Sequence, residues 1–178
     1  MDNFSIKENI SKLEEWSGLK YRQVLYDSDV DGQSSQIFQD KIINHSHLYF
    51  IVIDSNINVF GHYLNKKIEQ TDSDIYDFDI FLFTLYSNGR SDVEKFKSKK
   101  MVCMHFYDNG FYYCGDITSD YSGYYSVNGI GEIDCRVTED ISKFFDVNEP
   151  EIFTGACYSF GYDNFYKPER LVVIEMKE

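Results

Sequence analysis

The sequence predicts an α+β protein, a two-sheet antiparallel β-sandwich that is flanked by a few short helices. Many short runs of aromatic and β-branched residues alternate with clusters of Asp, Asn, Ser and Gly, which is typical of strands and tight turns. The helical patterns are few and lie near the start of the chain. The chain has 178 residues, enough to bury a core, so we expect a single domain over residues 1–178.

The first predicted element is an amphipathic helix that ends at Gly18. Ser5 and Glu8 form a capping box, and apolar side chains recur at helical spacing: Ile6, Ile10, Leu13 and Trp16. Such a stripe can pack on its own domain or dock on another protein. We expect the segment 1–18 to pack on the domain itself.

A second short helix is predicted after the acidic segment Asp27–Gly32. Ser34 or Ser35 can cap this helix, and its apolar residues are expected on one side: Ile37, Phe38, Ile42 and Ile43. The two helices are expected to precede all of the strands.

Strand patterns begin at residue 48. Leu48–Ile53 and Val59–Leu64 flank a turn at residues 54–58 and predict a hairpin, whose first strand is apolar enough to be buried on both faces. Ile80–Tyr86 predicts another strand in the core.

A second hairpin is predicted from Met101–Tyr107 and Phe111–Cys114. The segment between them contains Asn109 and Gly110, and Asn-Gly favours a tight turn because both residues tolerate positive φ. The last predicted elements are a helical turn and three short strands: the turn Ile141–Phe145 and the strands Gly123–Val127, Glu132–Val137 and Arg170–Met176.

The charge of the chain argues against nucleic-acid binding. The formal net charge is −13, with 30 acidic and 17 basic residues, and this surface repels phosphate backbones. The largest basic cluster, Lys95–Lys100, is too small to hold the chain on an anionic membrane. The first residues carry acids and no segment reaches transmembrane length, so we expect a cytoplasmic protein that does not insert into membranes.

No catalytic motif is recognised, and we expect a protein that is not an enzyme. The four cysteines are far apart without a CxxC pair, which indicates reduced, mostly buried thiols: Cys103, Cys114, Cys135 and Cys157. A thiol-based or otherwise unrecognised enzyme stays open as an alternative. Four carboxylates could form a glycosidase pair but are more simply a solvated acidic face on an exposed loop: Asp72, Asp74, Asp77 and Asp79.

Two weak metal patterns are present. Asp27, Asp29 and Asp31 before Gly32 fit the first half of a calcium loop, but Phe38 stands where a bidentate glutamate is needed. We expect an Asp-rich turn that caps the following helix, with calcium-dependent binding as an alternative. Zinc would require two distant pairs to meet: His45 with His47, and Cys103 with His105.

No cofactor is expected. Gly129 and Gly131 form a G-x-G that lacks the following helix of a dinucleotide site. The surplus of aromatics could serve to bind a sugar or a protein, although we expect most of these rings in the core: Tyr107, Phe111, Tyr112, Tyr113, Tyr121, Tyr124 and Tyr125.

Several segments together resemble the TLDc domain family. The likeness begins with Leu25–Ser28, continues through Val59–Gly61 and ends with Asp79 and Phe81–Leu85. It is clearest over residues 25–85, and the positions that carry it are Tyr26, Asp31, Gly32, Phe38, Phe60, Gly61, Phe81 and Phe83. Later segments depart from the family pattern: only Gly115–Asp116 represents its glycine-rich part, and Leu171–Met176 replaces a closing strand that ends in tryptophan.

The resemblance implies a sandwich flanked by helices and a non-enzymatic, protein-binding role. It also implies a contribution to oxidative-stress resistance, as in some relatives. Several relatives bind the vacuolar proton-pumping ATPase, which implies a protein partner in the soluble part of that pump. Such a partner would recruit a cytoplasmic protein to organelle membranes. The oligomeric state stays open.

Overall fold

Two antiparallel sheets of six strands each form the protein in a computed structural model, which describes residues 6–87, 90–108, 110–115, 125–133, 135–149, 151–154 and 164–178. Sheet A contains, in order, β1 (Lys20–Asp27), β12 (Pro168–Lys177), β2 (Leu48–Asp54), β3 (Val59–Leu64), β5 (Phe81–Ser87) and β6 (Arg90–Lys97). Sheet B contains β11 (Asn164–Tyr166), β10 (Cys135–Val137), β9 (Tyr125–Val127), β8 (Tyr112–Gly115), β7 (Val102–Phe106) and β4 (Asp74–Asp77).

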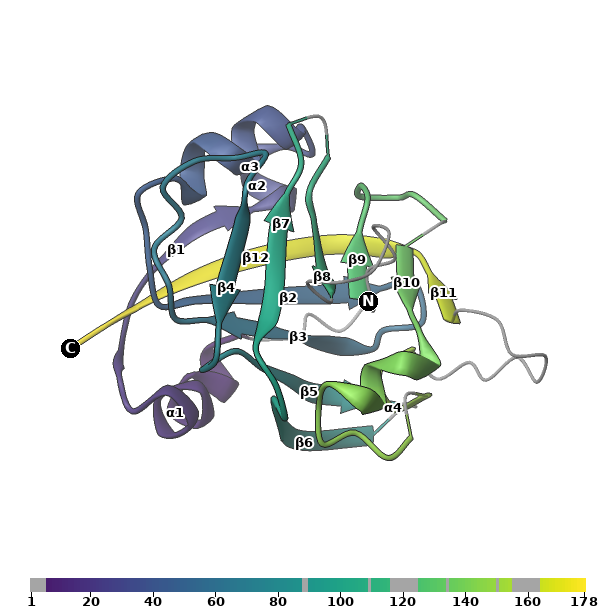
Figure 1. Ribbon diagram of the computed structural model, residues 1–178. Coiled ribbons are helices and arrows are strands. Elements are labelled where there is room, and N and C mark those ends of the chain that lie inside the picture. Colours follow the sequence, from purple (N-terminus) through teal and green to yellow (C-terminus); the bar gives the residue numbers. More distant parts are fainter. Residues whose placement is uncertain are drawn as a thin grey trace.

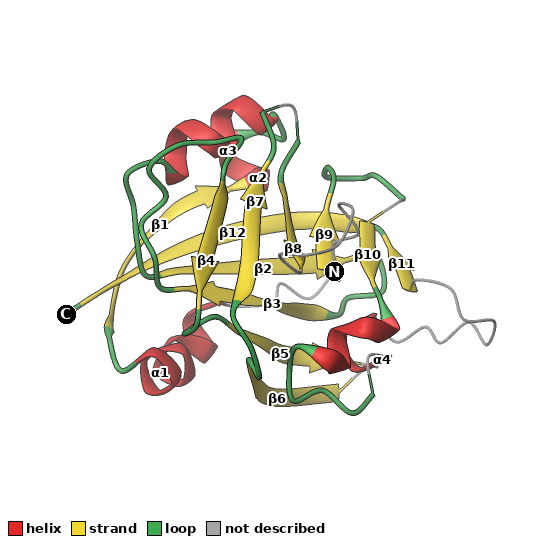
Figure 2. Cartoon of the chain, viewed as in Figure 1, coloured by secondary structure: helices red, strands yellow, loops and turns green. Residues whose placement is uncertain are grey.

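The sheets pack face to face, with their strands crossing at a steep angle (Figure 1). Sheet B lies in front of sheet A in this view. The main apolar core contains side chains from both sheets, such as Phe50 and Phe60 of sheet A and Met104 and Phe106 of sheet B. The predicted α+β sandwich is confirmed, and Figure 2 shows how few helices accompany the strands.

Sheet A is buried on both faces at its centre. β2 and β3 are buried along almost their whole length, as predicted for Leu48–Ile53. Phe50 belongs to the core between the sheets, whereas Ile51 belongs to a second apolar cluster on the outer face. Gly61 pairs with Ile51, and a Cβ at Gly61 would lie 1.8 Å from the carbonyl oxygen of Phe50. Glycine is therefore required there.

The helix α1 (Ile6–Ser17) packs on the outer face of sheet A. Leu13 is fully buried in the outer cluster, and its carbonyl oxygen accepts a 2.8 Å hydrogen bond from the Tyr49 hydroxyl. The ring of Trp16 lies 5.8 Å from that of Phe83. The predicted helix is confirmed over these residues, whereas the capping residue Ser5 lies outside the described residues. No helix among the described residues is long and apolar enough to cross a bilayer.

The helix α3 (Ser35–Ile42) closes one end of the sandwich through Phe38. This ring is fully buried and lies within 4.8–6.4 Å of five other aromatic rings: Tyr26, Phe50, Phe106, Phe111 and Tyr112. Ile37 is 38% exposed, so the expectation that it shares the buried side was wrong, because adjacent helical residues point about 100° apart. Ser34 is the N-cap, but its side chain makes no capping hydrogen bond.

The expectation that two helices precede all strands was wrong. β1 lies between α1 and α3 and pairs with β12. Bulges at Tyr21/Gln23 and Val24/Tyr26 interrupt the alternation of β1 and leave Val24 41% exposed, so no period of two is visible in the sequence. The acidic segment after β1 is a short helix, α2 (Ser28–Asp31), which Asp27 caps by accepting a 3.1 Å hydrogen bond from the Asp29 amide. The Asp-rich turn therefore caps α2, not α3.

Two charged edge strands were missed. β6 contains Lys95 and Lys97, which the sequence marked only as part of a basic cluster, and β4 lies in the Asp-rich segment expected to be a loop. Each is the terminal strand of its sheet, and edge strands carry charges that discourage pairing with other chains. Such sequences lack the apolar alternation on which strand prediction depends.

The last third of the chain agrees in part with the prediction. The hairpin of β7 and β8 is confirmed, although Asn109 lies outside the described residues. The strand predicted over Gly123–Val127 is found as β9 over its described residues, whereas β10 is shorter than predicted, and the helical turn is a 3₁₀ helix, η1 (Glu139–Lys143). The sequence missed β11 and the short helix α4 (Glu151–Thr154).

Candidate binding face on sheet B

The outer face of sheet B presents polar and aromatic side chains in one cross-strand row. Asp74 pairs with His105, His105 with Tyr113, Tyr113 with Ser126, Ser126 with Arg136, and Arg136 with Phe165. Alternate residues of the same strands, such as Met104 and Val137, point into the core. We call this outer surface, with the loops at the ends of β4 and β7, the sheet B face.

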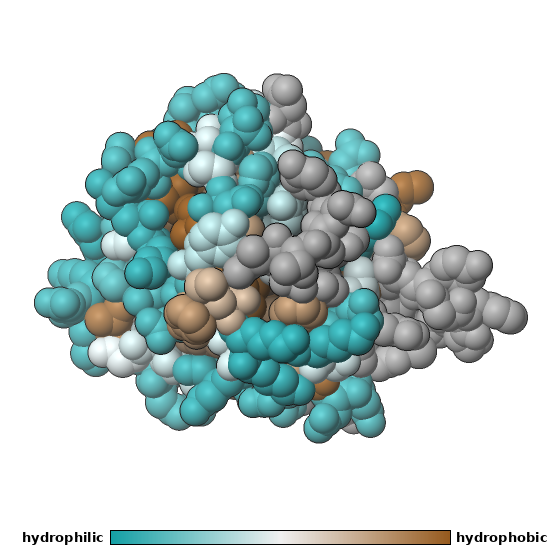
Figure 3. All heavy atoms as spheres, in the orientation of Figure 1, coloured by the Kyte–Doolittle hydropathy of each residue, from teal (hydrophilic) through white to brown (hydrophobic). Residues whose placement is uncertain are grey.

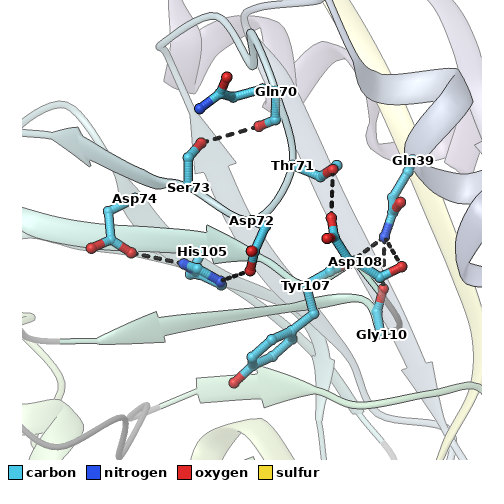
Figure 4. A network of polar contacts seen from close by, with 10 residues as sticks. All are labelled: Gln39, Gln70, Thr71, Asp72, Ser73, Asp74, His105, Tyr107, Asp108 and Gly110. Carbon is cyan, nitrogen blue, oxygen red and sulfur yellow. Dashed lines mark hydrogen bonds and ion pairs between the residues drawn. The ribbon is translucent and has the colours of Figure 1, made fainter.

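His105 stands between two carboxylates of the sheet B face (Figure 4). Its Nδ1 lies 2.8 Å from Asp74 Oδ1, and its Nε2 lies 3.5 Å from Asp72 Oδ1. The hydrogen bond with His105 lowers the pKa of Asp74. Asp72 adopts a left-handed conformation with a φ of 52° and is held there by a 2.7 Å hydrogen bond from its amide to the Phe106 carbonyl oxygen. The side chain of Asp74 and the backbone of Asp72 are therefore anchored next to the imidazole.

Aromatic rings hold His105 from its sides. The imidazole stacks on Tyr113 with a centroid distance of 5.2 Å, and the ring of Tyr107 lies 5.2 Å from His105 and 5.4 Å from Tyr113. Burial raises the pKa of Tyr107, and the charge of Arg136 partly opposes this effect. At the far end of the row, Arg136 lies 5.5 Å from the ring of Phe165.

A hollow of about 530 Å³ opens to solvent next to this cluster. It is lined by Asp72, Tyr107, Asp108, Gly110 and Asn128. Among the described residues, its lining therefore includes an aromatic residue, Tyr107, and two acidic residues, Asp72 and Asp108. On the side of the molecule that Figure 3 shows, the described atoms are mainly hydrophilic and the apolar atoms occupy small areas between them.

The buried side chain of Gln39 fixes the shape of this hollow. Its Nε2 reaches from α3 and donates hydrogen bonds to the carbonyl oxygens of Tyr107, Asp108 and Gly110, the last two at 3.1 and 3.4 Å. The Thr71 hydroxyl donates a 3.0 Å hydrogen bond to Asp108 Oδ1 (Figure 4). The hollow is thus formed before any ligand arrives, which lowers the entropic cost of binding.

The order of the titratable groups does not favour thiol catalysis. Cys103 and His105 share the outer face, as predicted for a strand, but the thiol interacts with Asp74. A thiol nucleophile needs the imidazole as its direct neighbour, whereas here the carboxylate lies between thiol and imidazole. Burial and the charge of Asp74 raise the pKa of Cys103 to about 12, so the thiol stays protonated at neutral pH.

Burial also separates the other described cysteines from solvent. Cys103, Cys114 and Cys135 are buried, as expected, and Cys103 and Cys114 are free thiols. Burial raises the pKa of the Cys114 thiol as well. Cys157 lies outside the described residues.

The four aspartates of the Asp-rich segment have different environments. Asp72 and Asp74 are 67% and 44% exposed and belong to the sheet B face. The expectation of a solvated face on a loop was wrong for Asp77, which is 1% exposed at the end of β4. Asp77 accepts hydrogen bonds from the amides of Asn65, at 2.8 Å, and Asp79, at 2.9 Å, because a buried carboxylate requires donors.

The carboxylates of the half calcium loop bind cations of the protein itself. Asp27 accepts two hydrogen bonds from Arg170, at 2.9 and 2.5 Å, and Asp29 lies 3.3 Å from the same guanidinium. Asp31 pairs with Lys41 at 2.9 Å, and this hydrogen bond lowers the pKa of Asp31. These contacts tie α2 to β12 and α3.

The residues considered for zinc do not meet. His45 and His47 lie in the loop before β2 and not on a strand. His45 Nδ1 lies 2.8 Å from Glu175, and His47 Nδ1 lies 2.9 Å from the side-chain oxygen of Asn65. Within the described ranges, no three His, Cys, Asp or Glu side chains are grouped as a metal site requires.

Most of the aromatic candidates are core residues. Phe111, Tyr112 and Tyr125 are buried between the sheets, whereas Tyr121 and Tyr124 lie outside the described residues. The sequence had marked Asp72, Asp74, Cys103, His105, Tyr107 and Tyr113 separately, for different chemistries. The contributions of Gln39, Asp108 and Arg136 were missed, because a single sequence does not show which distant residues become neighbours in the fold.

The residues that carry the family resemblance build the scaffold. Tyr26 is fully buried and its hydroxyl donates a 2.8 Å hydrogen bond to the carbonyl oxygen of Gly32, which has a φ of 100°. Asp31 accepts a 2.9 Å hydrogen bond from the Asp27 amide. The phenylalanines of the motif are all buried: Phe38, Phe60, Phe81 and Phe83.

Comparison with known families supports the resemblance over a longer stretch than its motif. The chain matches the TLDc domain over residues 4–155, a span that reaches from α1 to α4 and so extends well beyond residues 25–85. No match is found among curated proteins. Because the matched span covers most of the 178 residues and the fold is the sandwich that the family implies, the chain belongs to the TLDc domain family.

Proposed function

We propose that this TLDc chain is a non-enzymatic, single-domain interaction module that binds a protein partner through the sheet B face. The observation that carries the proposal is the open hollow that Tyr107 lines together with Asp72 and Asp108. An aromatic face and carboxylates both attract cations, so a lysine or arginine of a partner suits the hollow.

The charge of the whole chain supports a basic partner. A net charge of −13 accelerates encounter with a positively charged surface, and the aromatic rings of the face supply apolar contact area after docking. The protonated thiol of Cys103 supports a binding role over redox catalysis.

The family suggests which partner to test first. We propose the soluble part of the vacuolar proton-pumping ATPase as this partner, with the chain in the cytoplasm and recruited to organelle membranes through the pump. A contribution to oxidative-stress resistance would then follow from control of the pump and not from a reactive cysteine.

A charge-matched pair of variants tests the proposal. Asp72→Asn/Asp108→Asn removes both carboxylates of the hollow, and asparagine tolerates the left-handed conformation of residue 72. The control Glu15→Gln/Asp146→Asn removes the same charge from side chains that are 65% and 64% exposed elsewhere on the chain. Affinity for the purified soluble part of the pump is measured by biolayer interferometry.

The first variant should bind at least about tenfold more weakly than the wild type, since buried charge pairs at interfaces are worth about 2 kcal/mol or more. The control should stay within about twofold. Equal affinities of both variants would contradict the assigned face, and no binding by the wild type would contradict the assigned partner.

A further inference from the structure

A second candidate site lies where α1 meets β5 and β6, along the lower edge of the molecule in Figure 1. Two hollows of about 290 and 280 Å³ flank the paired side chains of Lys95 and Phe81. The first is lined also by Phe78, Lys97 and Ser98, and the second by Trp16, Ser17, Tyr63 and Asn65. We call the two hollows together the Lys95 groove.

Lys95 is a half-buried cation that has no acidic partner within the described residues. Its ammonium group lies 3.9 Å from the centroid of the Phe81 ring and donates a 2.9 Å hydrogen bond to the carbonyl oxygen of Trp16. No described carboxylate lies within 4 Å of it, although Asp79 also lines both hollows. An ammonium group has three donors, and described residues accept from one of them.

The surroundings of Lys95 add to its need for an anion. Burial lowers its pKa, and the charge of Lys97 lowers it further. In a chain with 30 acidic and 17 basic residues, Lys95 and Lys97 together outweigh Asp79 in the lining of the first hollow, which gives its described lining a net positive charge. A ligand carboxylate would restore the interactions that the ammonium group lost on leaving water.

An apolar side chain stands beside this positive site. Phe78 lines the same hollow as Lys95 and Lys97 and is 68% exposed. Its carbonyl oxygen accepts a 2.9 Å hydrogen bond from the Ser98 hydroxyl, which anchors its backbone to the segment after β6. A ligand that fits the groove therefore has a carboxylate next to an apolar group.

We propose that the Lys95 groove binds an acidic peptide segment of a partner protein, in which a glutamate or aspartate follows an apolar residue. The carboxylate pairs with Lys95, and the apolar side chain covers Phe78. This site is separate from the sheet B face. It takes an anionic group, whereas the sheet B hollow takes a cationic one, so it does not depend on the function proposed above.

The test uses Trp16 as a reporter, because it is the only tryptophan of the chain and lines the groove. The probe is a capped tetrapeptide with the sequence glycine, phenylalanine, glutamate, glycine, and its partner probe has glutamine in place of glutamate. Titration of the full chain should give a saturable change of Trp16 fluorescence, with the glutamate peptide binding about tenfold more tightly, as a charge-assisted hydrogen bond predicts.

Three variants assign the effect to the groove, and circular dichroism checks that each is folded. Lys95→Met keeps the apolar stem and should remove the preference for glutamate. Phe78→Ser should weaken both peptides, and Lys67→Met, which removes the same charge from an exposed position, should leave both affinities unchanged.

Two results would overturn the inference: no saturable response to the glutamate peptide, or a preference for glutamate that persists in Lys95→Met. If free N-acetylglutamate bound as tightly as the peptide, the groove would be a site for small carboxylates, and the peptide assignment would fall.

Discussion

The two sheets of this TLDc chain differ in what covers them. The central strands of sheet A, such as β2 and β3, are buried on both faces, by the core on one side and by a cluster with α1 on the other. Sheet B is buried on its inner face, and its central strands also bury Cys103, Tyr113 and Ser126 on the outer face, whereas Arg136 and Phe165 reach solvent there. Packing therefore constrains the residues on both faces of the central strands of sheet A, whereas we expect the exposed outer positions of sheet B, such as Arg136 and Phe165, to change without loss of the core.

This difference separates the family motif from the proposed function. Four motif residues of sheet A are buried, namely Phe60, Gly61, Phe81 and Phe83. The residues that line the hollow come from the loops and turns of sheet B, such as Tyr107 and Asp108. The motif thus identifies the scaffold, and the proposed binding hollow lies at positions outside it.

The largest expected difference between the sheets is in the loss of unfolding free energy when a glycine is replaced by alanine. Gly61→Ala should cost about 3 kcal/mol of unfolding free energy or prevent folding, because its Cβ would meet a backbone oxygen at 1.8 Å. Gly110→Ala, on the edge of the sheet B hollow, should cost about 1 kcal/mol or less, because its Cβ would lie 3.3 Å from a side-chain atom of Tyr107. Urea denaturation measures both, and equal costs would contradict the comparison.

Lowering the pH should reduce the free energy of unfolding because of His62 in sheet A. This imidazole is fully buried, stacks on Phe50 at 4.6 Å, and neither of its ring nitrogens has a hydrogen-bond partner among the described residues. Burial lowers its pKa to about 3, from 6.5. The unfolded chain therefore takes up a proton between these pH values that the folded chain does not, and stability falls as the pH falls below 6.5.

Between pH 7.5 and pH 5 this proton uptake should lower the free energy of unfolding by about 2 kcal/mol. His62→Leu should remove that part of the pH dependence, which denaturation at both pH values measures. The same slope in the variant and the wild type would show that His62 is not responsible.

A smaller effect is expected from Gln39, which connects α3 to the hollow. Gln39→Leu leaves the carbonyl oxygens of Tyr107, Asp108 and Gly110 without this donor and should cost about 1–2 kcal/mol. It should also weaken partner binding, because the turn loses its fixed shape. The control Gln36→Leu on the same helix removes an exposed amide that donates a hydrogen bond to Asp40 and should have neither effect.

The smallest expected change concerns the thiols. Mild peroxide treatment should leave Cys103, Cys114 and Cys135 unmodified, because all three thiols are buried and the raised pKa values of Cys103 and Cys114 keep those two protonated. Intact mass and peptide mapping measure this, and sulfenic acid at Cys103 would favour the thiol-enzyme alternative.

The core strands could be predicted from the sequence, but the edge strands could not. Strands such as Leu48–Asp54 were found because they are apolar throughout, and buried strands must be. β4 and β6 were missed because edge strands carry charges in place of that pattern. β1 was missed because two bulges shift its alternation.

The sheet B face could be predicted only as separate residues. Asp74, His105 and Tyr113 become neighbours through the register of three strands, and no spacing in the sequence encodes that register. Gln39 reaches the hollow from a helix that is far away in sequence. Such contacts are properties of the folded chain.

Hydrogen exchange of the chain alone and in complex with the soluble part of the pump shows which sheet the partner covers. We expect new protection at residues 72–76 and 103–110 of the sheet B face, and none at residues 48–64 of β2 and β3. Protection restricted to sheet A and α1, with the sheet B face unchanged, would contradict this expectation.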